Sequence, residues 1–83
     1  MLHKREKFLG TVIQSINLNG GDICVDFFKR PNGTYGYEEY RRDTETLEGW
    51  FPIGFYSGKL FDTHELARQD AMKSIAWLAP STE

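Results

Sequence analysis

The chain has 83 residues and a mass of 9.6 kDa, which suits a single small domain, 1–83. Its 10 basic and 12 acidic residues give a net charge of −2, so no strong field directs it toward nucleic acid or a membrane surface. The one cysteine, Cys24, excludes an internal disulfide and a cysteine-only metal cage.

Three stretches with strand character occupy the first half of the chain. Residues 8–18 mix β-branched and polar types, 23–30 carry apolar odd positions, and 35–42 are rich in tyrosine. Turn signals separate them at 19–22 (Asn-Gly-Gly-Asp) and 31–34 (Pro-Asn-Gly-Thr), because glycine accepts positive φ and Asn-Gly favours a tight hairpin. Consecutive strands joined by short turns predict an antiparallel meander.

The middle of the chain is less regular. Residues 43–49 are polar and aperiodic, which indicates a loop. Residues 50–56 are dense in aromatics but contain Pro52 and Gly54. Because proline lacks a ladder donor, any strand here lies at a sheet edge or begins after Pro52.

A helix is predicted over 63–79, stopped by Pro80. Asp62 fits the N-cap, Glu65 three residues later completes a capping box, and Phe61 and Leu66 are spaced for a hydrophobic staple. One face of the helix carries an apolar stripe suited to a sheet. The stripe consists of Ala67, Ala71, Ile75 and Leu78, with Met72 at its border.

These elements predict an α+β domain: an antiparallel meander of three or four strands with one C-terminal helix packed on one face. We expect disordered tails at 1–6 and 80–83. A single helix covers only one face of a sheet, so the other face is expected to remain open.

The sequence does not favour catalysis. His3 lies in the N-terminal tail, His64 in the first helical turn at the surface, and nothing in the spacing brings either near Cys24, expected to be buried in a strand. Glu38 and Glu39 point to opposite faces of a strand, which suits them poorly for acid–base work. Zinc spacings, phosphate loops and dinucleotide fingerprints are absent. We expect a non-enzyme without cofactor or metal.

Nucleic-acid binding is the alternative function. Its candidate contacts are basic and aromatic residues of the predicted second hairpin: Lys29, Arg30, Tyr37, Arg41 and Arg42. Strand aromatics could stack on bases. However, the two basic pairs lie toward opposite ends of that hairpin, and nearby carboxylates would repel phosphate. This partner is therefore disfavoured.

A protein-interaction surface is the leading hypothesis, because the chain holds more large side chains than one small core absorbs. The candidate interface residues are Trp50, Phe51, Phe55, Tyr56 and Trp77. Contiguous exposed aromatics mark interfaces. The competing interpretation is that 50–56 folds over the sheet and completes the core. We therefore predict a binding or assembly module for a protein partner or a second copy, possible as a homodimer.

Neither a membrane partner nor a secreted location is expected. The first residues are charged and lack the apolar stretch of a signal peptide, and no apolar run approaches the ~18 residues of a membrane span. We expect a cytoplasmic protein.

The end of the chain resembles two groups of proteins. Residues 60–63 (Leu-Phe-Asp-Thr), 65–67 (Glu-Leu-Ala) and Ala71 resemble the last strand and helix of AP2-type DNA-binding domains. With 75–78 (Ile-Ala-Trp-Leu), the ending is also similar to small uncharacterised bacterial β-β-β-α proteins. The resemblance implies a three-stranded antiparallel sheet packed on one helix. AP2-type domains read DNA with strand arginines and tryptophans, which residues 8–28 lack, so no DNA contact is carried over.

Overall fold

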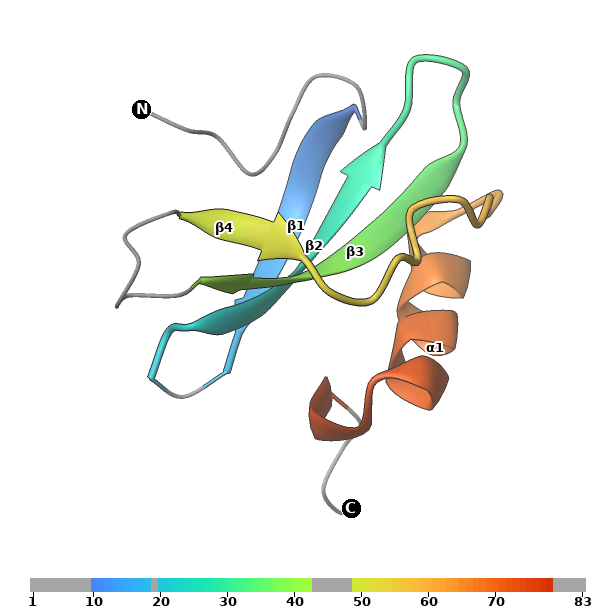
Figure 1. Cartoon of the computed structure of the whole chain (residues 1–83). Coiled ribbons are helices and arrows are strands. Elements are labelled where there is room, and N and C mark those ends of the chain that lie inside the picture. Colours follow the sequence, from blue (N-terminus) through green and yellow to red (C-terminus); the bar gives the residue numbers. More distant parts are fainter. Residues whose placement is uncertain (1–9, 19, 43–48, 79–83) are drawn as a thin grey trace.

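The computed structural model describes residues 10–18, 20–42 and 49–78. These ranges hold four strands, an α-helix and a short 3-10 helix: β1 (Thr11–Asn17), β2 (Ile23–Lys29), β3 (Tyr35–Arg42), β4 (Trp50–Pro52), α1 (His64–Ser74) and η1 (Ala76–Leu78). The strands form one antiparallel sheet in the order β1-β2-β3-β4, and α1 packs against it (Figure 1). The predicted α+β class is confirmed.

Both predicted hairpins form in the predicted places. Gly33, at φ +91°, occupies the β2–β3 turn, where the Arg30 N–H donates to the Thr34 carbonyl at 2.7 Å. β1 pairs with β2 through a bulge at Ile13. β4 is an edge strand that ends at Pro52, as the missing proline donor requires.

The core lies between α1 and one face of the sheet. On this face, odd-numbered residues of β2 and β3 meet the small-residue stripe of the helix. The buried cluster contains Val25, Phe27, Tyr37, Ala67, Ala71 and Ile75. The two alanines let the helix backbone approach the sheet closely, and the predicted stripe is confirmed up to Ile75.

The opposite face of the sheet is also buried over β2 and β3, so the expectation that it remains open is wrong there, whereas Ser15 and Asn17 of β1 on this face are exposed. Its side chains on β2 and β3 are at most 3% exposed: Cys24, Asp26, Phe28, Glu38 and Tyr40. Part of the cover comes from Arg30, whose guanidinium lies 5.0 Å above the Phe28 ring. Another part comes from the chain after β4, which is bonded to Glu38.

The helix differs from its predicted bounds at both ends. Thr63, not Asp62, is the N-cap: its backbone is extended and its Oγ1 accepts the Leu66 N–H at 3.1 Å. This one-residue shift moves the capping-box and staple positions off the predicted residues. At the other end, α1 stops at Ser74, because Ile75 takes extended dihedrals and turns the chain toward the sheet.

Other expectations fall outside the described residues. These are the tails at 1–6 and 80–83 and nearly all of the loop at 43–49. Within the part of the chain that the structure describes, no helix combines the length and the apolar character needed to cross a membrane.

Candidate functional site: the loop after β4

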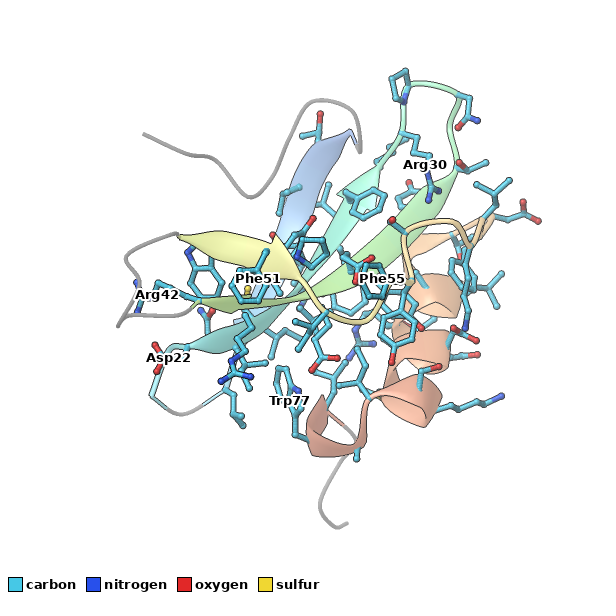
Figure 2. The ribbon with its side chains drawn as sticks, viewed as in Figure 1. Asp22, Arg30, Arg42, Phe51, Phe55 and Trp77 are labelled. Carbon is cyan, nitrogen blue, oxygen red and sulfur yellow. The ribbon has the colours of Figure 1, made fainter. Side chains whose placement is uncertain are left out.

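The segment 53–59, here called the aromatic loop, follows β4 along the outer edge of β3. Phe55 lies in this loop (Figure 2). Its φ is +57°, and its side chain is 79% exposed. A positive φ is uncommon for any residue but glycine, and for a bulky residue it is an outlier. Phe55 therefore combines an unfavourable backbone conformation with an aromatic ring in solvent.

The other candidate interface residues are half-buried. The Tyr56 ring packs 5.0 Å from that of Tyr37 in the core, and its hydroxyl donates to the Ser74 carbonyl at 3.4 Å. The Trp77 Nε1–H donates to Glu39 Oε2 at 2.7 Å, which fixes η1 against β3. Tyr56 and Trp77 thus help complete the core, while Phe55 faces solvent.

Trp50 and Phe51 lie on β4, at the edge of the sheet. Arg42 covers the Trp50 ring, with its guanidinium carbon 5.1 Å from the ring centroid. Phe51 stands opposite Arg41 in the β3–β4 ladder. Both aromatics are half-buried, whereas Phe55 in the aromatic loop is exposed.

The aromatic loop is bonded to the sheet through a buried carboxylate. Glu38 is 1% exposed, and its Oε1 accepts the Ser57 N–H at 2.9 Å. Its Oε2 accepts the N–H groups of Gly54 at 3.2 Å and Glu39 at 3.0 Å. Hydrogen bonds to a charged group contribute roughly 1.5–3 kcal/mol each, more than neutral ones.

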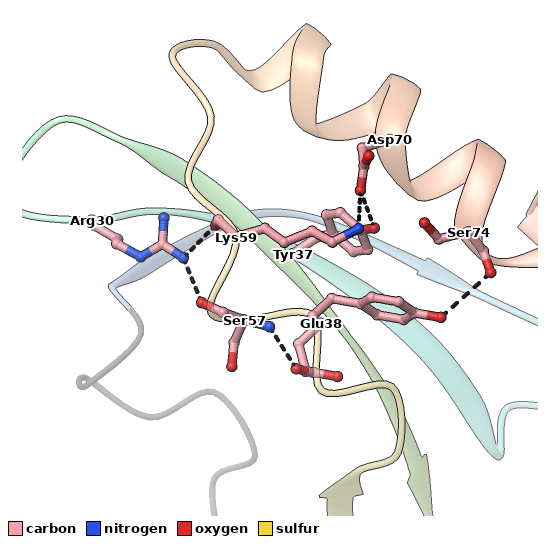
Figure 3. Close-up of polar contacts among 8 residues, drawn as sticks. Arg30, Tyr37, Glu38, Ser57, Lys59, Asp70 and Ser74 are labelled. Carbon is pink, nitrogen blue, oxygen red and sulfur yellow. Dashed lines mark hydrogen bonds and ion pairs between the residues drawn. The ribbon is translucent and has the colours of Figure 1, made fainter.

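A guanidinium group holds the carbonyl side of the same loop (Figure 3). Arg30 Nη2 donates to the carbonyls of Ser57 at 2.7 Å and Lys59 at 3.0 Å, and Nη1 donates to that of Tyr35 at 2.9 Å. Gly36 makes room for it, because a Cβ there would lie 2.6 Å from Nη2. Burial lowers the pKa of Arg30, which stays charged at neutral pH.

A third set of contacts joins the loop to α1. Asp70 Oδ2 lies 2.8 Å from the Lys59 ammonium and accepts the Tyr37 hydroxyl at 2.6 Å (Figure 3). The hydrogen bonds from Lys59 and then Tyr37 lower the pKa of Asp70. Burial, followed by the hydrogen bond to Asp70, raises the pKa of Tyr37.

The candidate nucleic-acid contacts do not form one surface. Tyr37 is 0% exposed in the core, which removes it from the residues available to stack on a base. Arg30 is engaged with backbone carbonyls. Arg30 and Arg42 lie at opposite ends of the sheet (Figure 2), as the β2–β3 register requires. Lys29 and Arg41 are exposed, one at each of these ends.

Arg42 has partners of its own. Its Nη2 donates to the Gly21 carbonyl at 3.3 Å and lies 3.4 Å from Asp22 Oδ1. This guanidinium also lies over Trp50. These contacts place Arg42 in the packing of the sheet end rather than in a free basic stripe.

The residues considered for catalysis are not brought together. His64 is half-buried, not at the surface as predicted: its Nε2 lies 2.9 Å from Gln14 Oε1 and its ring stacks on Tyr35. Cys24 is fully buried on the other face of the sheet. His3 is not among the described residues. In the described ranges, no group of three or more His, Cys, Asp or Glu residues is arranged to hold a metal ion.

Glu38 and Glu39 diverge, as predicted. Glu38 is bonded to the aromatic loop, whereas Glu39 is bonded to Trp77. The two carboxylates therefore share no acid–base site, and each has a separate structural partner.

A shallow groove of about 310 Å³ lies between α1 and residues 60–62, which follow the aromatic loop in the chain. Its apolar lining includes Leu60 and Leu66, which are 64% and 45% exposed. Asp70 and Lys73 contribute its charged lining. The exposed apolar surface after β4 thus extends beyond Phe55.

Comparison with protein-family models, curated proteins and solved structures finds no match to this chain. The AP2-type resemblance is therefore unconfirmed, and the fold of the described residues adds a fourth strand to the three it implies. A small α+β domain is the class that the structure defines.

Proposed function

We propose that the protein is a non-catalytic binding module that recognises a protein partner through the aromatic loop, with Phe55 as the anchor residue. The observation that carries this proposal is the Phe55 side chain, which is 79% exposed at a φ of +57°. A conformation that is unfavourable in the free chain and exposes an aromatic ring is typical of a functional segment. Single aromatic anchors dominate the binding energy of many interfaces.

The surroundings of Phe55 support a protein partner. Residues 49–58 carry no charged side chain, and charge depletion distinguishes the centre of an interface from the remaining surface. Ile53, two residues before Phe55, is 37% exposed, and the groove with Leu60 follows in the chain. A partner that covers Phe55 therefore meets an uncharged stretch of chain on both sides of it.

The experiment is a peptide selection. A phage-displayed library of random peptides is panned on the wild-type protein and, in parallel, on Phe55→Ala. Since most of the Phe55 side chain is exposed, this change removes the anchor while the core remains intact. We expect peptides that bind the wild-type protein and bind Phe55→Ala at least about tenfold more weakly.

Ile13→Ala is a control for a general loss of apolar surface, because Ile13 is exposed on β1 and belongs neither to the aromatic loop nor to the groove beside α1. Sedimentation over a dilution series, with and without a single-stranded oligonucleotide in low salt, completes the test. Peptides retained equally by Phe55→Ala would contradict the proposal. Salt-sensitive oligonucleotide binding unaffected by Phe55→Ala would favour the nucleic-acid alternative instead.

A further inference from the structure

Two side chains of opposite charge, Glu38 on β3 and Arg30 directly after β2, hold the peptide groups on either side of Ser57. The Ser57 N–H donates to Glu38 Oε1 at 2.9 Å, and the Ser57 carbonyl accepts from Arg30 Nη2 at 2.7 Å. Figure 3 shows both bonds converging on this residue. Loop backbone usually bonds to water or to nearby loop groups, whereas here two charged side chains, both from outside the loop, serve as its partners.

Both oxygens of Glu38 are committed to backbone donors. Oε2 accepts from Gly54 and Glu39 while Oε1 accepts from Ser57, so three N–H groups converge on one carboxylate. An ionised carboxylate only accepts hydrogen bonds, which matches this all-donor environment. A glutamine amide would direct its own NH₂ donor at one or more of these N–H groups.

These fixed points flank Phe55. Gly54 precedes it, and Ser57 follows it by two residues. With 79% of its side chain in solvent, Phe55 gains little from its own packing to hold a φ of +57°. The conformation must therefore be held by the bonds on either side. Gly54 is itself required, because a Cβ at that position would lie 2.1 Å from the Tyr56 ring.

We infer that Glu38 and Arg30 are positioning residues of the interaction site: they fix the backbone around Phe55 in the conformation that presents its ring to a partner. The inference rests on the proposed function. Its physical basis is preorganisation, since ordering a loop during association weakens binding. With Glu38 and Arg30 in place, the partner meets a loop that is already ordered.

The test compares Glu38→Gln with Glu39→Gln. The two variants make the same isosteric change of charge at adjacent positions of β3, but Glu39 contacts Trp77 on the other face of the sheet. Amide hydrogen exchange is measured by NMR in the full chain without ligand. We expect exchange at Gly54 and Ser57 to rise about tenfold or more in Glu38→Gln, with the core amides of β2 unchanged. In Glu39→Gln the loop amides should keep their wild-type rates.

Binding is the second measurement, with a Phe55-dependent peptide from the selection as the probe. A loop ordered for only a tenth of the time binds about tenfold more weakly. Glu38→Gln should therefore lose affinity in parallel with its loop protection, and Glu39→Gln should not. A merely structural role of Glu38 would leave affinity unchanged in the folded variant.

The outcomes separate this inference from the proposed function. Wild-type exchange rates at Gly54 and Ser57 in folded Glu38→Gln, or unchanged peptide affinity, would overturn the inference. If Glu38→Gln does not fold, the same two measurements are made on Arg30→Lys. This variant leaves Glu38 in place, but a lysine ammonium cannot reproduce the paired hydrogen bonds of the guanidinium. A wild-type protein that selects no Phe55-dependent peptide refutes the proposed function, whatever the exchange rates show.

Discussion

Replacing Phe55 by glycine and, separately, by alanine tests the backbone conformation on which the proposed site depends. A left-handed conformation costs an L-residue roughly 1–2 kcal/mol, and glycine avoids that cost. Glycine in turn lowers the free energy of unfolding by about 0.5–1 kcal/mol relative to alanine, because the unfolded chain has more conformational freedom at glycine. Phe55 is 79% exposed, so both variants lose the same small burial term, about 0.3–0.6 kcal/mol for a fifth of a phenylalanine. Phe55→Gly should therefore be more stable than Phe55→Ala by about 0.5–1 kcal/mol.

Urea denaturation followed by far-ultraviolet circular dichroism measures this difference, with equal m-values as the condition for comparing the two variants. The matched control is Gln69, an exposed residue within α1 at ordinary helical dihedrals. There the order should reverse, with glycine about 1 kcal/mol less stable than alanine. Alanine more stable than glycine at position 55 would show that Phe55 does not hold a positive φ in solution. The argument for its functional role would then fail.

Two further predictions concern α1. Thr63→Ala should lower the free energy of unfolding by about 1 kcal/mol, because it removes the N-cap hydrogen bond. Asp62→Ala should change it by less than about 0.5 kcal/mol. Urea denaturation measures both values, and a larger loss for Asp62→Ala would show that Asp62 is the cap. The pKa of Asp70 is lower in the folded than in the unfolded protein. Ionised Asp70 therefore stabilises the fold at pH values above its unfolded-state pKa of about 4, and this stabilisation is lost as the pH falls through its folded-state pKa. The excess melting temperature of the wild type over Asp70→Asn should thus shrink on acidification, and an excess constant down to pH 2 would contradict this.

The parts of the fold that the sequence predicts correctly depend on local chemistry. One glycine pair and one Asn-Gly mark the two hairpin turns, and the spacing of Ala67, Ala71 and Ile75 defines the buried side of α1. The third strand is predicted at 35–42 and found at Tyr35–Arg42. In each case, the residues that decide the structure are neighbours in the chain, so their pattern is visible without tertiary information.

The wrong predictions concern features that depend on contacts between segments far apart in the chain. Asp62 and Thr63 are both good cap residues, and Thr63 takes the position in a segment whose Phe61 pairs with the distant Tyr35. The helix ends at Ser74, five residues before the predicted Ala79, and Trp77 in the segment beyond it reaches Glu39, a contact across 38 positions in the chain. The second face of the sheet is covered partly by Arg30 and by the segment after β4. The predicted order of strands and one helix offers no element to cover this face.

The aromatic segment 50–56 shows most clearly why the site itself stays ambiguous in the sequence. The choice between core and interface is made one residue at a time: Tyr56 packs on Tyr37, whereas Phe55, its neighbour, points into solvent. Glycine accepts a positive φ most readily, yet in this segment the positive φ falls on Phe55 and not on Gly54. We infer that the backbone conformation of Phe55 depends on Glu38 and Arg30. In the sequence, Glu38 is an ordinary carboxylate of a strand and Arg30 is one member of a basic pair. The residues that hold the backbone next to Phe55 therefore carry no local signal, and only their convergence on Ser57 identifies them.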